Sequence, residues 1–404
     1  MINGTKAGRL RKSSIYEFNY LAHDVEQPGV ALSMPPSERL TWRDGALFAG
    51  MDQHLPEGDL LLRLSAALPR KRLDPMHLLA MIGANGIGRL GYSAANGQML
   101  ASPLPVDRGA LLSMRFSQSL FDELVEAHWH TGSGIAGVQP KIMLADRAGA
   151  PFPTVIVKVA PIAYPGLVAN EFLCLSAARR AGIETPGFNL SHDGQILVVD
   201  RFDLVWQDGG SVSRLGFEDI AALMNLRVRD VLGARKYQGS YRHIAELLQR
   251  LGLAADGMRR FFEQVAFSVM VRNGDAHLKN FGVLVPAVGP IRLSPLFDVA
   301  TTAAYTYARF AGDAEQTDRT MALKLLSGRH HTRAYPTVEE LLRFGTDICG
   351  VALPYVVLDR IAQAMHETLA DARGDARISP SLLRLLCPIW ASGMGYASTA
   401  VTER

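Results

Sequence analysis

The spacing of apolar residues divides the chain into short strands and longer helices. Alternating positions and β-branched apolar runs predict strands at 8–10, 16–20, 142–145, 153–159, 195–203 and 282–285. Apolar residues three and four positions apart predict helices at 60–68, 75–82, 117–129, 167–181, 217–224, 241–251, 257–271, 338–347, 355–371 and 379–396. We therefore expect a small α+β unit over the first ~100 residues and a mostly helical chain from Gly216 onward.

The composition is that of an ordinary globular protein. Its 404 residues suffice for two or three domains, with 48% hydrophobic and 20% charged residues. The N-terminus lacks the apolar stretch of a signal peptide, and no run of about 18 apolar residues indicates a membrane span. Cys174, Cys349 and Cys387 are far apart and are expected to be free thiols in a reducing compartment. A net charge of +3 does not by itself imply a surface for duplex DNA, and direct contact with DNA stays open. The free thiols and the missing signal peptide predict a cytoplasmic protein.

A cluster of polar residues lies between the helix expected at 257–271 and the strand expected at 282–285. It contains two amides, an acid, a histidine and a lysine: Asn273, Asp275, His277, Lys279 and Asn280. Polar side chains on a loop between buried elements are typical of a functional site, because rigid elements hold the loop in place. Asp298 follows Asp275 and Asn280 further along the chain. An Asp base, an Asn and a downstream Asp orient a hydroxyl and bind Mg²⁺ in phosphoryl transfer.

A second group of candidates lies around the strands expected at 142–145 and 153–159. The stretch 131–141 contains three glycines, which suit close approach of backbone amides to a phosphate but also suit an ordinary turn. Lys158 lies in an apolar strand. It is either a phosphate-binding lysine or an edge-strand lysine that discourages aggregation. Glu171 follows near the start of the next helix. A strand lysine followed by a helix glutamate is the order of the kinase ion pair, which favours phosphate binding.

Two further segments are ambiguous on sequence alone. Gly86, Gly88 and Gly91 form a G-x-G-x-x-G pattern, but it follows a predicted helix and precedes none, which indicates a glycine turn. The strand at 195–203 ends in charged residues. In a nucleotide-binding lobe such a strand closes the adenine pocket, and Phe202 would stack on the base; a solvated strand end is the equal alternative.

Short motifs along nearly the whole chain share one characteristic order. They are Gly137–Lys141, Ile156–Lys158, Asn170–Phe172, Asp200–Asp203, Asp275–Phe281 and Ser294–Asp298, with N-terminal matches at Asn3–Gly8, Leu32–Pro35, Asp52–Pro56 and Leu78–Gly88. The Asp275 block together with the 139–141 loop is specific, whereas no single piece would be. Through these motifs the chain resembles the HipA-type serine/threonine kinase toxins of bacterial toxin–antitoxin systems.

The resemblance implies a fold, an activity and partners. The fold is α+β and two-lobed, like a protein kinase, with an extra N-terminal α/β subdomain at 1–102. The β-rich N-lobe with the Gly-rich loop and phosphate lysine is at 103–204, and the helical C-lobe with the catalytic loop is at 205–404. The implied activity is ATP- and Mg²⁺-dependent phosphorylation of a protein serine or threonine, typically in an aminoacyl-tRNA synthetase or another translation protein, by a growth-arresting toxin. The implied partner is a HipB-like helix-turn-helix antitoxin, which links the kinase to operator DNA, with no membrane involved.

The resemblance also assigns roles position by position. Asp275 is the catalytic base, and Asn280 and Asp298 bind Mg²⁺. Lys158 contacts phosphate, with Glu171 as its structural ion-pair partner. The implied ATP site further includes Ala136, Gly137, Val138, Gln139, Pro140 and Lys141 in the phosphate loop, Asp200, Arg201 and Phe202 at the adenine-side hinge, and His277, Leu278, Lys279 and Phe297.

One position departs from the family pattern. Members often carry a serine three residues before the glycine of the loop, where autophosphorylation switches the enzyme off. Here that position is Gly134, and Ala136 precedes Gly137. Ser133 is the nearest hydroxyl, and it is the candidate for autophosphorylation in this loop.

Two other functions stay open on the sequence. A catalytically weak relative would act mainly as a co-repressor scaffold with its antitoxin on operator DNA; the presence of Asp275, Asn280, Asp298 and Lys158 disfavours this alternative. A kinase of small molecules is the other, and the large N-terminal subdomain disfavours it, because small substrates need no extra recognition surface.

Overall fold

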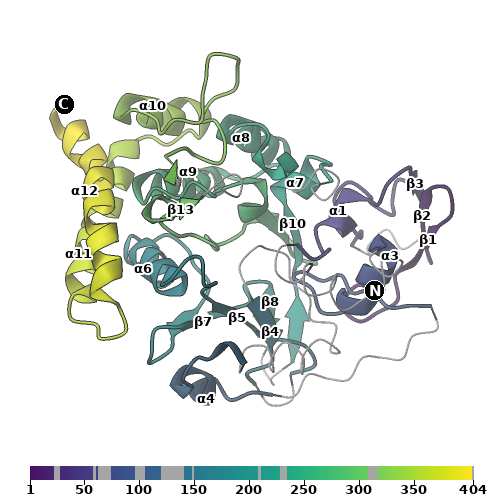
Figure 1. The fold of residues 1–404 in the computed structure, drawn as a ribbon. Helices are drawn as coiled ribbons and strands as arrows, with labels where there is room; N and C mark the ends of the chain where they lie inside the picture. The colour runs from purple at the N-terminus through teal and green to yellow at the C-terminus, as the bar shows by residue number, and fades with distance from the viewer. Residues whose placement is uncertain are drawn as a thin grey trace. The chain divides into compact units, whose positions relative to one another are not determined.

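The computed structural model describes most of the chain (Figure 1). The described residues are 1–21, 28–57, 61, 74–95, 105–119, 141–147, 150–207, 211–227, 234–307, 316–317 and 319–402. The phosphate-loop residues 136–140, Ser133 and most of the helices expected at 60–68 and 117–129 lie outside these ranges.

The elements alternate between short strands and helices in the first half and are mainly helical in the second. In chain order they are β1 (Gly8–Lys12), β2 (Tyr16–Tyr20), β3 (Thr41–Asp44), α1 (Ala49–Asp52), α3 (Pro75–Ile82), α4 (Arg108–Ser113), β4 (Lys141–Leu144), β5 (Val155–Val159), α6 (Leu167–Arg180), β6 (Phe188–Leu190), β7 (Ile196–Asp200), β8 (Leu204–Trp206), β9 (Val212–Arg214), β10 (Gly216–Asp219), α7 (Ile220–Leu223), η3 (Ala234–Tyr237), α8 (Tyr241–Arg250), α9 (Ala255–Met270), η4 (Leu278–Asn280), β11 (Gly282–Val285), β12 (Arg292–Leu293), η5 (Thr302–Ala304), β13 (Thr306–Tyr307), β14 (Gln316–Thr317), α10 (Val338–Arg343), η6 (Phe344–Ile348), α11 (Pro354–Ala372) and α12 (Pro380–Thr402).

The chain divides into two compact units. Unit 1 comprises Met1–Val159, Val198–Lys236 and Gly282–Pro290. Unit 2 comprises Ala160–Leu197, Tyr237–Phe281 and Ile291–Arg404. The chain passes from one unit to the other several times, and one of these passages lies within β7.

The N-terminal strands form an antiparallel sheet of order β1-β2-β3. The alternation in β2 buries Tyr16, Phe18 and Tyr20 on one face, because successive side chains of a strand point to opposite sides. These rings belong to one apolar core with Met51 of α1 and Leu78 of α3. The strand predicted at 16–20 and the helix predicted at 75–82 are confirmed.

The glycine-rich segment after α3 is a turn closed by a buried ion pair. Arg201 donates to Asn85 O (3.0 Å) and Gly86 O (2.8 Å), while the Gly88 N–H donates to Asp203 Oδ2 (2.6 Å). The side chains of Arg201 and Asp203 are 0% exposed and pair at 2.6 Å. Gly88 has a φ of 92°, which suits glycine because it has no Cβ. The predicted glycine turn is confirmed. Its backbone groups at Asn85, Gly86 and Gly88 form hydrogen bonds with Arg201 and Asp203 of the same chain.

A sheet of order β4-β5-β7-β6 carries the predicted phosphate lysine. Every residue of β5 is buried, including Lys158. β4 runs antiparallel to β5, with Lys141 opposite Lys158 and Leu144 opposite Val155. The strands predicted at 142–145 and 153–159 are confirmed.

The prediction of one helix over 217–224 is wrong. Its first residues belong to strand β10, which pairs antiparallel with β11 and places Phe217 opposite Leu284. Helix α7 begins only at Ile220, where the Asp219 carboxylate caps its N-terminus. The apolar spacing suits both conformations, and a pairing strand distant in sequence decides between them.

Glu218 of β10 is a buried acid. It is 5% exposed, and its Oε1 accepts the N–H of Leu32 at 2.6 Å. Burial raises the pKa of Glu218 to about 7, against the opposing effects of the Leu32 N–H and the Arg89 charge. The folded protein therefore keeps a proton that the unfolded chain releases between about pH 4.5 and pH 7. The free energy of unfolding falls as the pH rises through this window.

Glu218→Gln is expected to remove this pH-dependent loss of stability, since the neutral amide oxygen can accept the same N–H. At pH 8 the variant should unfold with a free energy up to about 3 kcal/mol higher than that of the wild type, and at pH 4.5 the difference should vanish. Thermal unfolding at both pH values measures this difference. The exposed control Glu38→Gln should leave the pH dependence unchanged. A Glu218→Gln variant that keeps the wild-type pH dependence would contradict the assignment.

The helices predicted after residue 240 are confirmed in unit 2. α11 packs against α6 and α12, and Figure 1 shows α11 and α12 side by side. Phe261, Phe262 and Phe267 of α9 and Trp390 of α12 are fully buried among these helices. Within the described ranges, no helix has the length and apolar character needed to cross a bilayer. The three cysteines are free thiols, as expected.

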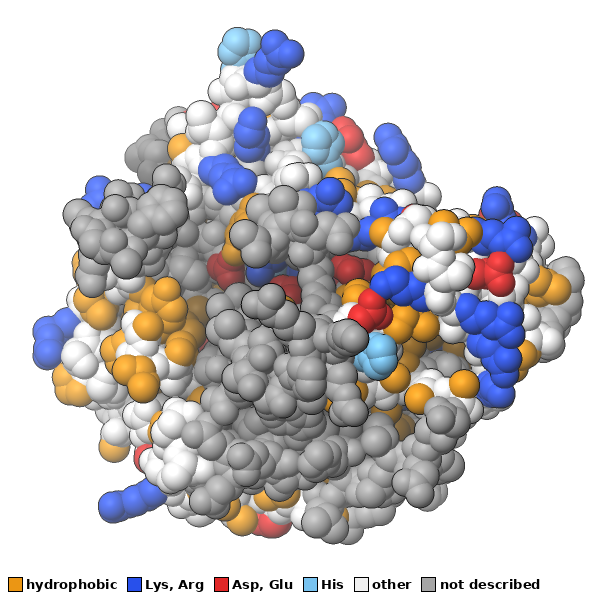
Figure 2. Space-filling view, turned by 45° about the vertical axis from the view of Figure 1, so that its right-hand side comes forward, with side chains coloured by type: hydrophobic (Ala, Val, Ile, Leu, Met, Phe, Trp, Pro, Cys, Tyr) orange, Lys and Arg blue, Asp and Glu red, His pale blue; other side chains and the backbone are white. Residues whose placement is uncertain are grey.

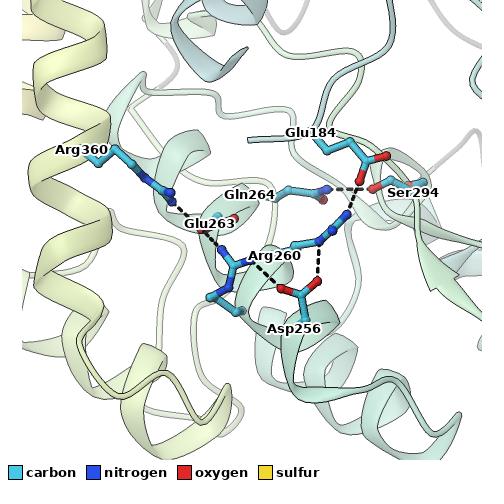
Figure 3. A network of polar contacts seen from close by, with 8 residues as sticks. Glu184, Asp256, Arg260, Glu263, Gln264, Ser294 and Arg360 are labelled. Atoms are coloured by element: carbon cyan, nitrogen blue, oxygen red, sulfur yellow. Dashed lines mark hydrogen bonds and ion pairs between the residues drawn. The ribbon is translucent and has the colours of Figure 1, made fainter. Parts of the chain in front are cut away.

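Helix α9 is bound to its neighbours by polar contacts (Figure 3). Glu263 is 2% exposed and pairs with Arg259 of the same helix and with Arg360 of α11. The next residue, Gln264, donates through Nε2 to Ser294 O at 2.8 Å. These bonds hold α9 to α11 and to the segment that precedes Asp298. The C-terminal end of α9 is therefore a rigid support for the loop that follows it.

Candidate active site

The polar loop at 273–281 begins where α9 ends. Arg272 has a φ of 56°, a left-handed conformation that turns the chain out of the helix. The Asn273 Oδ1 accepts the N–H of Asp275 at 3.1 Å, and the Asn280 Nδ2 donates to Asp275 O at 2.8 Å. Two asparagine side chains thus hold the backbone on both sides of Asp275.

Aromatic side chains anchor this loop from the interior. The Tyr241 hydroxyl donates to Ala276 O at 2.9 Å. The Phe281 ring packs edge to face against Tyr241 and Phe261, with centroid distances of 5.9 and 5.6 Å. The Asp275 side chain, in contrast, is 51% exposed. The interior side of the loop is therefore buried, whereas the Asp275 carboxylate is half-exposed. A substrate hydroxyl needs this access to a carboxylate.

Tyr237 and His277 are neighbours of the Asp275 carboxylate within unit 2. The Tyr237 hydroxyl donates to Asp275 Oδ1 at 2.7 Å. His277 Nε2 lies 3.9 Å from the same oxygen, and the His277 side chain is 7% exposed. The rings of Tyr237 and His277 meet edge to face, with centroids 5.2 Å apart. The carboxylate therefore stands beside a tyrosine and a histidine that pack against each other.

Asp298 has an unusual backbone conformation. Its φ is 56°, which costs a residue other than glycine on the order of 1–3 kcal/mol and persists only when the surroundings impose it. The flanking residues Leu296 and Val299 are 3% and 0% exposed. The Leu296 N–H also donates to Glu184 O at 2.8 Å. Strain of this kind, held by buried neighbours, is typical of functional sites.

The segment after Asp298 is bound to α6 and α12 through Thr301. The Thr301 N–H donates to Asn170 Oδ1 at 2.9 Å, and Asn170 Nδ2 donates to Thr301 O at 3.1 Å. The Trp390 Nε1 donates to Thr301 Oγ1 at 2.8 Å. All three residues are 0% exposed. Asn170, which the motif reading noted without a role, therefore positions the Asp298 segment.

In unit 1, two predicted phosphate contacts come together. Lys141 and Lys158 are directly opposite residues of β4 and β5, so their side chains start from the same face of the sheet. Lys158 is 4% exposed. Like charges opposite each other on neighbouring strands repel, and an anion on this face would offset the repulsion.

The predicted adenine-side hinge is partly occupied by structural contacts. The Arg201 guanidinium is buried against the glycine turn and also donates to Pro153 O at 3.2 Å. Asp200 pairs with Arg108, which also binds Asp146 at 2.5 Å. The Phe202 ring meets Phe217 edge to face at 5.3 Å. The Arg201 side chain thus forms its hydrogen bonds within the protein. The backbone of residues 200–202 remains the candidate for binding the adenine base.

The other predicted site residues are distributed over both units. Glu171 of α6 and Leu278 of the polar loop are buried in unit 2, and Lys279 and Phe297 of the same unit are partly exposed. Of the predicted phosphate loop, the described ranges contain Lys141 alone. Within these ranges, no three His, Cys, Asp or Glu side chains are grouped to hold a metal ion. Figure 2 shows Lys and Arg side chains at separate places among the described residues of the face drawn, with Asp and Glu side chains beside some of them.

Sequence reasoning missed the residues that hold the loop. Tyr237, Tyr241 and Thr302 contact it through side-chain oxygens, with Thr302 Oγ1 accepting the N–H of Gly274 at 2.6 Å. These residues lie outside the motifs, and no spacing rule connects them with Asp275. Asn273 stands beside the motif, and an Asn just before an Asp at a helix end was a usable signal for a local side-chain bond.

Two family models match the chain. One is described as the HipA N-terminal domain and matches residues 1–93. The other is described as the HipA-like C-terminal domain and matches residues 133–373. Together they cover more than half of the chain and include the 273–281 loop, Lys158 and Asp298.

Individual relatives agree with these models. The Sinorhizobium fredii protein named “Putative kinase Y4mE” is 25% identical over 339 residues, covering 78% of this chain and 77% of that protein. “Putative kinase Y4dM” of the same organism is 32% identical over 165 residues, covering 37% and 38%. A solved chain from the HipA, HipB and operator DNA complex of Shewanella oneidensis MR-1 has a TM-score of 0.68 and 18% identity, covering 99% of this chain and 96% of that one. The expected α+β, kinase-like fold with an N-terminal subdomain is confirmed, and the chain belongs to the HipA family.

Proposed function

We propose that this chain is an ATP- and Mg²⁺-dependent kinase that phosphorylates serine or threonine in a protein. The observation that carries the proposal is the loop in which Asn280 binds the backbone of the half-exposed Asp275. A base and a metal ligand on one rigid loop are what phosphoryl transfer to a hydroxyl requires. Two relatives that are both named “Putative kinase” support it.

The residues present suit a magnesium ion. The Asn280 amide donates through Nδ2 to Asp275 O, and this bond orients its Oδ1 as an oxygen ligand. Asp298 supplies a carboxylate from a strained position held by buried neighbours. Mg²⁺ is usually held by one or two protein oxygens together with phosphate oxygens and water. Asn280 and Asp298 would therefore hold the ion.

The two opposed lysines suit a polyphosphate. Lys141 and Lys158 offer two positive charges on one sheet face, and Lys158 is largely removed from water. Charge interactions strengthen where water is excluded. When bound, ATP would supply the phosphoryl group, and Mg²⁺ would neutralise part of the charge of its phosphates. The chain's own lysines bind the phosphates and limit their movement.

Asp275 would receive the acceptor hydroxyl. Its carboxylate is half-exposed and its backbone is held by Asn273 and Asn280, so a serine or threonine side chain can reach a carboxylate in a defined direction. An oriented carboxylate accepts the hydroxyl hydrogen bond and takes up the proton as the oxygen attacks phosphorus.

We further propose that the kinase acts as a growth-arresting toxin on a translation protein such as an aminoacyl-tRNA synthetase, in the cytoplasm. A HipB-like helix-turn-helix antitoxin would neutralise it and link it to operator DNA. The support for this partner is the similarity of fold to the HipA chain of the Shewanella oneidensis complex, which contains HipB and operator DNA.

The test is transfer of label from γ-labelled ATP to proteins of a bacterial lysate with Mg²⁺ present. We expect label on serine or threonine of a protein, lost when EDTA removes the metal and strongly reduced in Lys158→Met. Transfer that is absent from the wild-type protein under all these conditions would contradict the kinase and favour the scaffold function. Phosphopeptide mapping in the same experiment decides whether Ser133 is labelled.

A further inference from the structure

We propose that Tyr237 is a positioning residue that sets the orientation of the Asp275 carboxylate, and that Arg333 holds Tyr237 in place. The inference rests on the proposed function, because it concerns the base of that reaction. Neither Tyr237 nor Arg333 belongs to a motif around Asp275, and both come to it through the fold.

The central contact is a short hydrogen bond to the carboxylate. The Tyr237 hydroxyl donates to Asp275 Oδ1 at 2.7 Å, and Tyr237 comes from η3, far from Asp275 in sequence. Asn273 and Asn280 bind the backbone of Asp275, so these two bonds do not by themselves set its side-chain torsions. A bond to one carboxylate oxygen restricts those torsions, and it thereby also sets the direction of the other oxygen.

The contact contributes little to folding, which points to another purpose. The Asp275 side chain is 51% exposed. A hydrogen bond or charge pair at an exposed carboxylate adds little to stability, since water competes for the same oxygen. A productive geometry in catalysis, in contrast, depends on small differences in the direction of the base.

Tyr237 itself is supported from two sides. Arg333 Nη2 donates to Tyr237 O at 2.6 Å, and its guanidinium carbon lies 5.9 Å from the centre of the Tyr237 ring. On another side the ring meets the buried His277 edge to face. Arg333 is held in turn by its carbonyl, which accepts the N–H of Met321 at 2.7 Å. The hydroxyl is thus directed at Asp275 by a rigid frame.

The frame belongs to a segment with a distinctive charge. Residues 319–336 contain four Lys or Arg, two His and no acidic residue. The segment is joined to the start of α8, where the Tyr241 N–H donates to Lys324 O at 2.9 Å. Within this segment, Arg333 binds Tyr237. A displacement of Arg333 would therefore move Tyr237, and through the Tyr237 hydroxyl it would change the orientation of the Asp275 carboxylate.

The test compares Tyr237→Phe with the wild type. Phenylalanine keeps the ring packing and loses only the hydroxyl. We expect the rate of label transfer at saturating ATP to fall about 10- to 100-fold, with the KM for ATP and the melting temperature nearly unchanged. Arg333→Met should give a smaller loss of the same kind.

A matched control is Tyr20→Phe, which removes a buried tyrosine hydroxyl of the N-terminal core that donates to Met34 O at 2.5 Å. It should lower the melting temperature and leave the rate nearly unchanged. A Tyr237→Phe enzyme with wild-type rate, or one that loses rate only in proportion to lost stability, would overturn the proposal.

A second measurement does not depend on activity. In protein labelled with 3-fluorotyrosine, the fluorine resonance that Tyr237→Phe removes should shift when Asp275→Ala deletes the carboxylate. A resonance that does not move would refute the hydrogen bond even if the wild type is active. If the wild type transfers no label but the resonance moves, the proposed function fails while the Tyr237–Asp275 contact stands.

Discussion

Asp275→Asn is expected to lower the rate of phosphate transfer by about 10²- to 10⁴-fold at saturating ATP. The amide has the size of the carboxylate, and its oxygen can still accept the Tyr237 hydroxyl, so the fold and the packing of the loop should survive. The amide cannot accept a proton from the acceptor hydroxyl, and this is the property that the variant removes. The measurement is single-turnover transfer of label to the lysate protein identified with the wild type.

Two further measurements make this prediction specific. The affinity for Mg²⁺-ATP should remain near the wild-type value, because the proposed metal ligands Asn280 and Asp298 are retained. The control is Asp347→Asn, an exposed aspartate of η6 in the same unit, which should transfer label at the wild-type rate. An Asp275→Asn enzyme that keeps more than a tenth of the wild-type rate would remove Asp275 from the role of base.

Arg201→Ala is expected to lower the free energy of unfolding by about 3–5 kcal/mol. The wild-type guanidinium is 0% exposed and binds Asp203 together with the carbonyls of Asn85, Gly86 and Pro153. Its removal leaves a buried carboxylate without its cation. Urea unfolding followed by fluorescence measures the loss.

The same variant separates two roles for Arg201. The family resemblance implies a contact with ATP, whereas the contacts in the fold bind the glycine turn to the end of β7. If the structural role is the main one, the KM for ATP of the folded fraction stays near the wild-type value at low temperature. A large rise in this KM with unchanged stability would favour the nucleotide contact. Arg43→Ala is the control, because Arg43 is 64% exposed in its pair with Glu17 and its loss should change the free energy of unfolding far less than the loss of Arg201.

The sequence predicted the local elements well where periodicity was strong. The strand at 16–20, the helix at 75–82 and the helices after residue 240 are present with nearly the predicted bounds. The prediction of one helix over 217–224 was wrong, because Phe217 and its neighbours have a spacing that suits helix and strand alike. In such a segment the decision comes from hydrogen bonds to β11, which no local pattern contains.

The candidate site shows the same division. Residue types and spacing predicted Asp275 as a base and Asn280 and Asp298 as metal ligands, because few other side-chain sets suit phosphoryl transfer. The opposition of Lys141 and Lys158 follows from strand register, which the sequence left open. The commitment of Arg201 to the glycine turn is equally a matter of tertiary contact.

By itself, the sequence determined most of the local elements, and it predicted which residues carry chemistry and on which of these elements they stand. Tertiary structure alone decided what holds them: Tyr237 against the Asp275 carboxylate, Tyr241 under the loop, and Asn170 against Thr301 behind Asp298. The physical reason is the range of the interactions. Helix and strand periodicity and loop chemistry are set by neighbours along the chain, whereas the orienting hydrogen bonds join residues that only folding brings together.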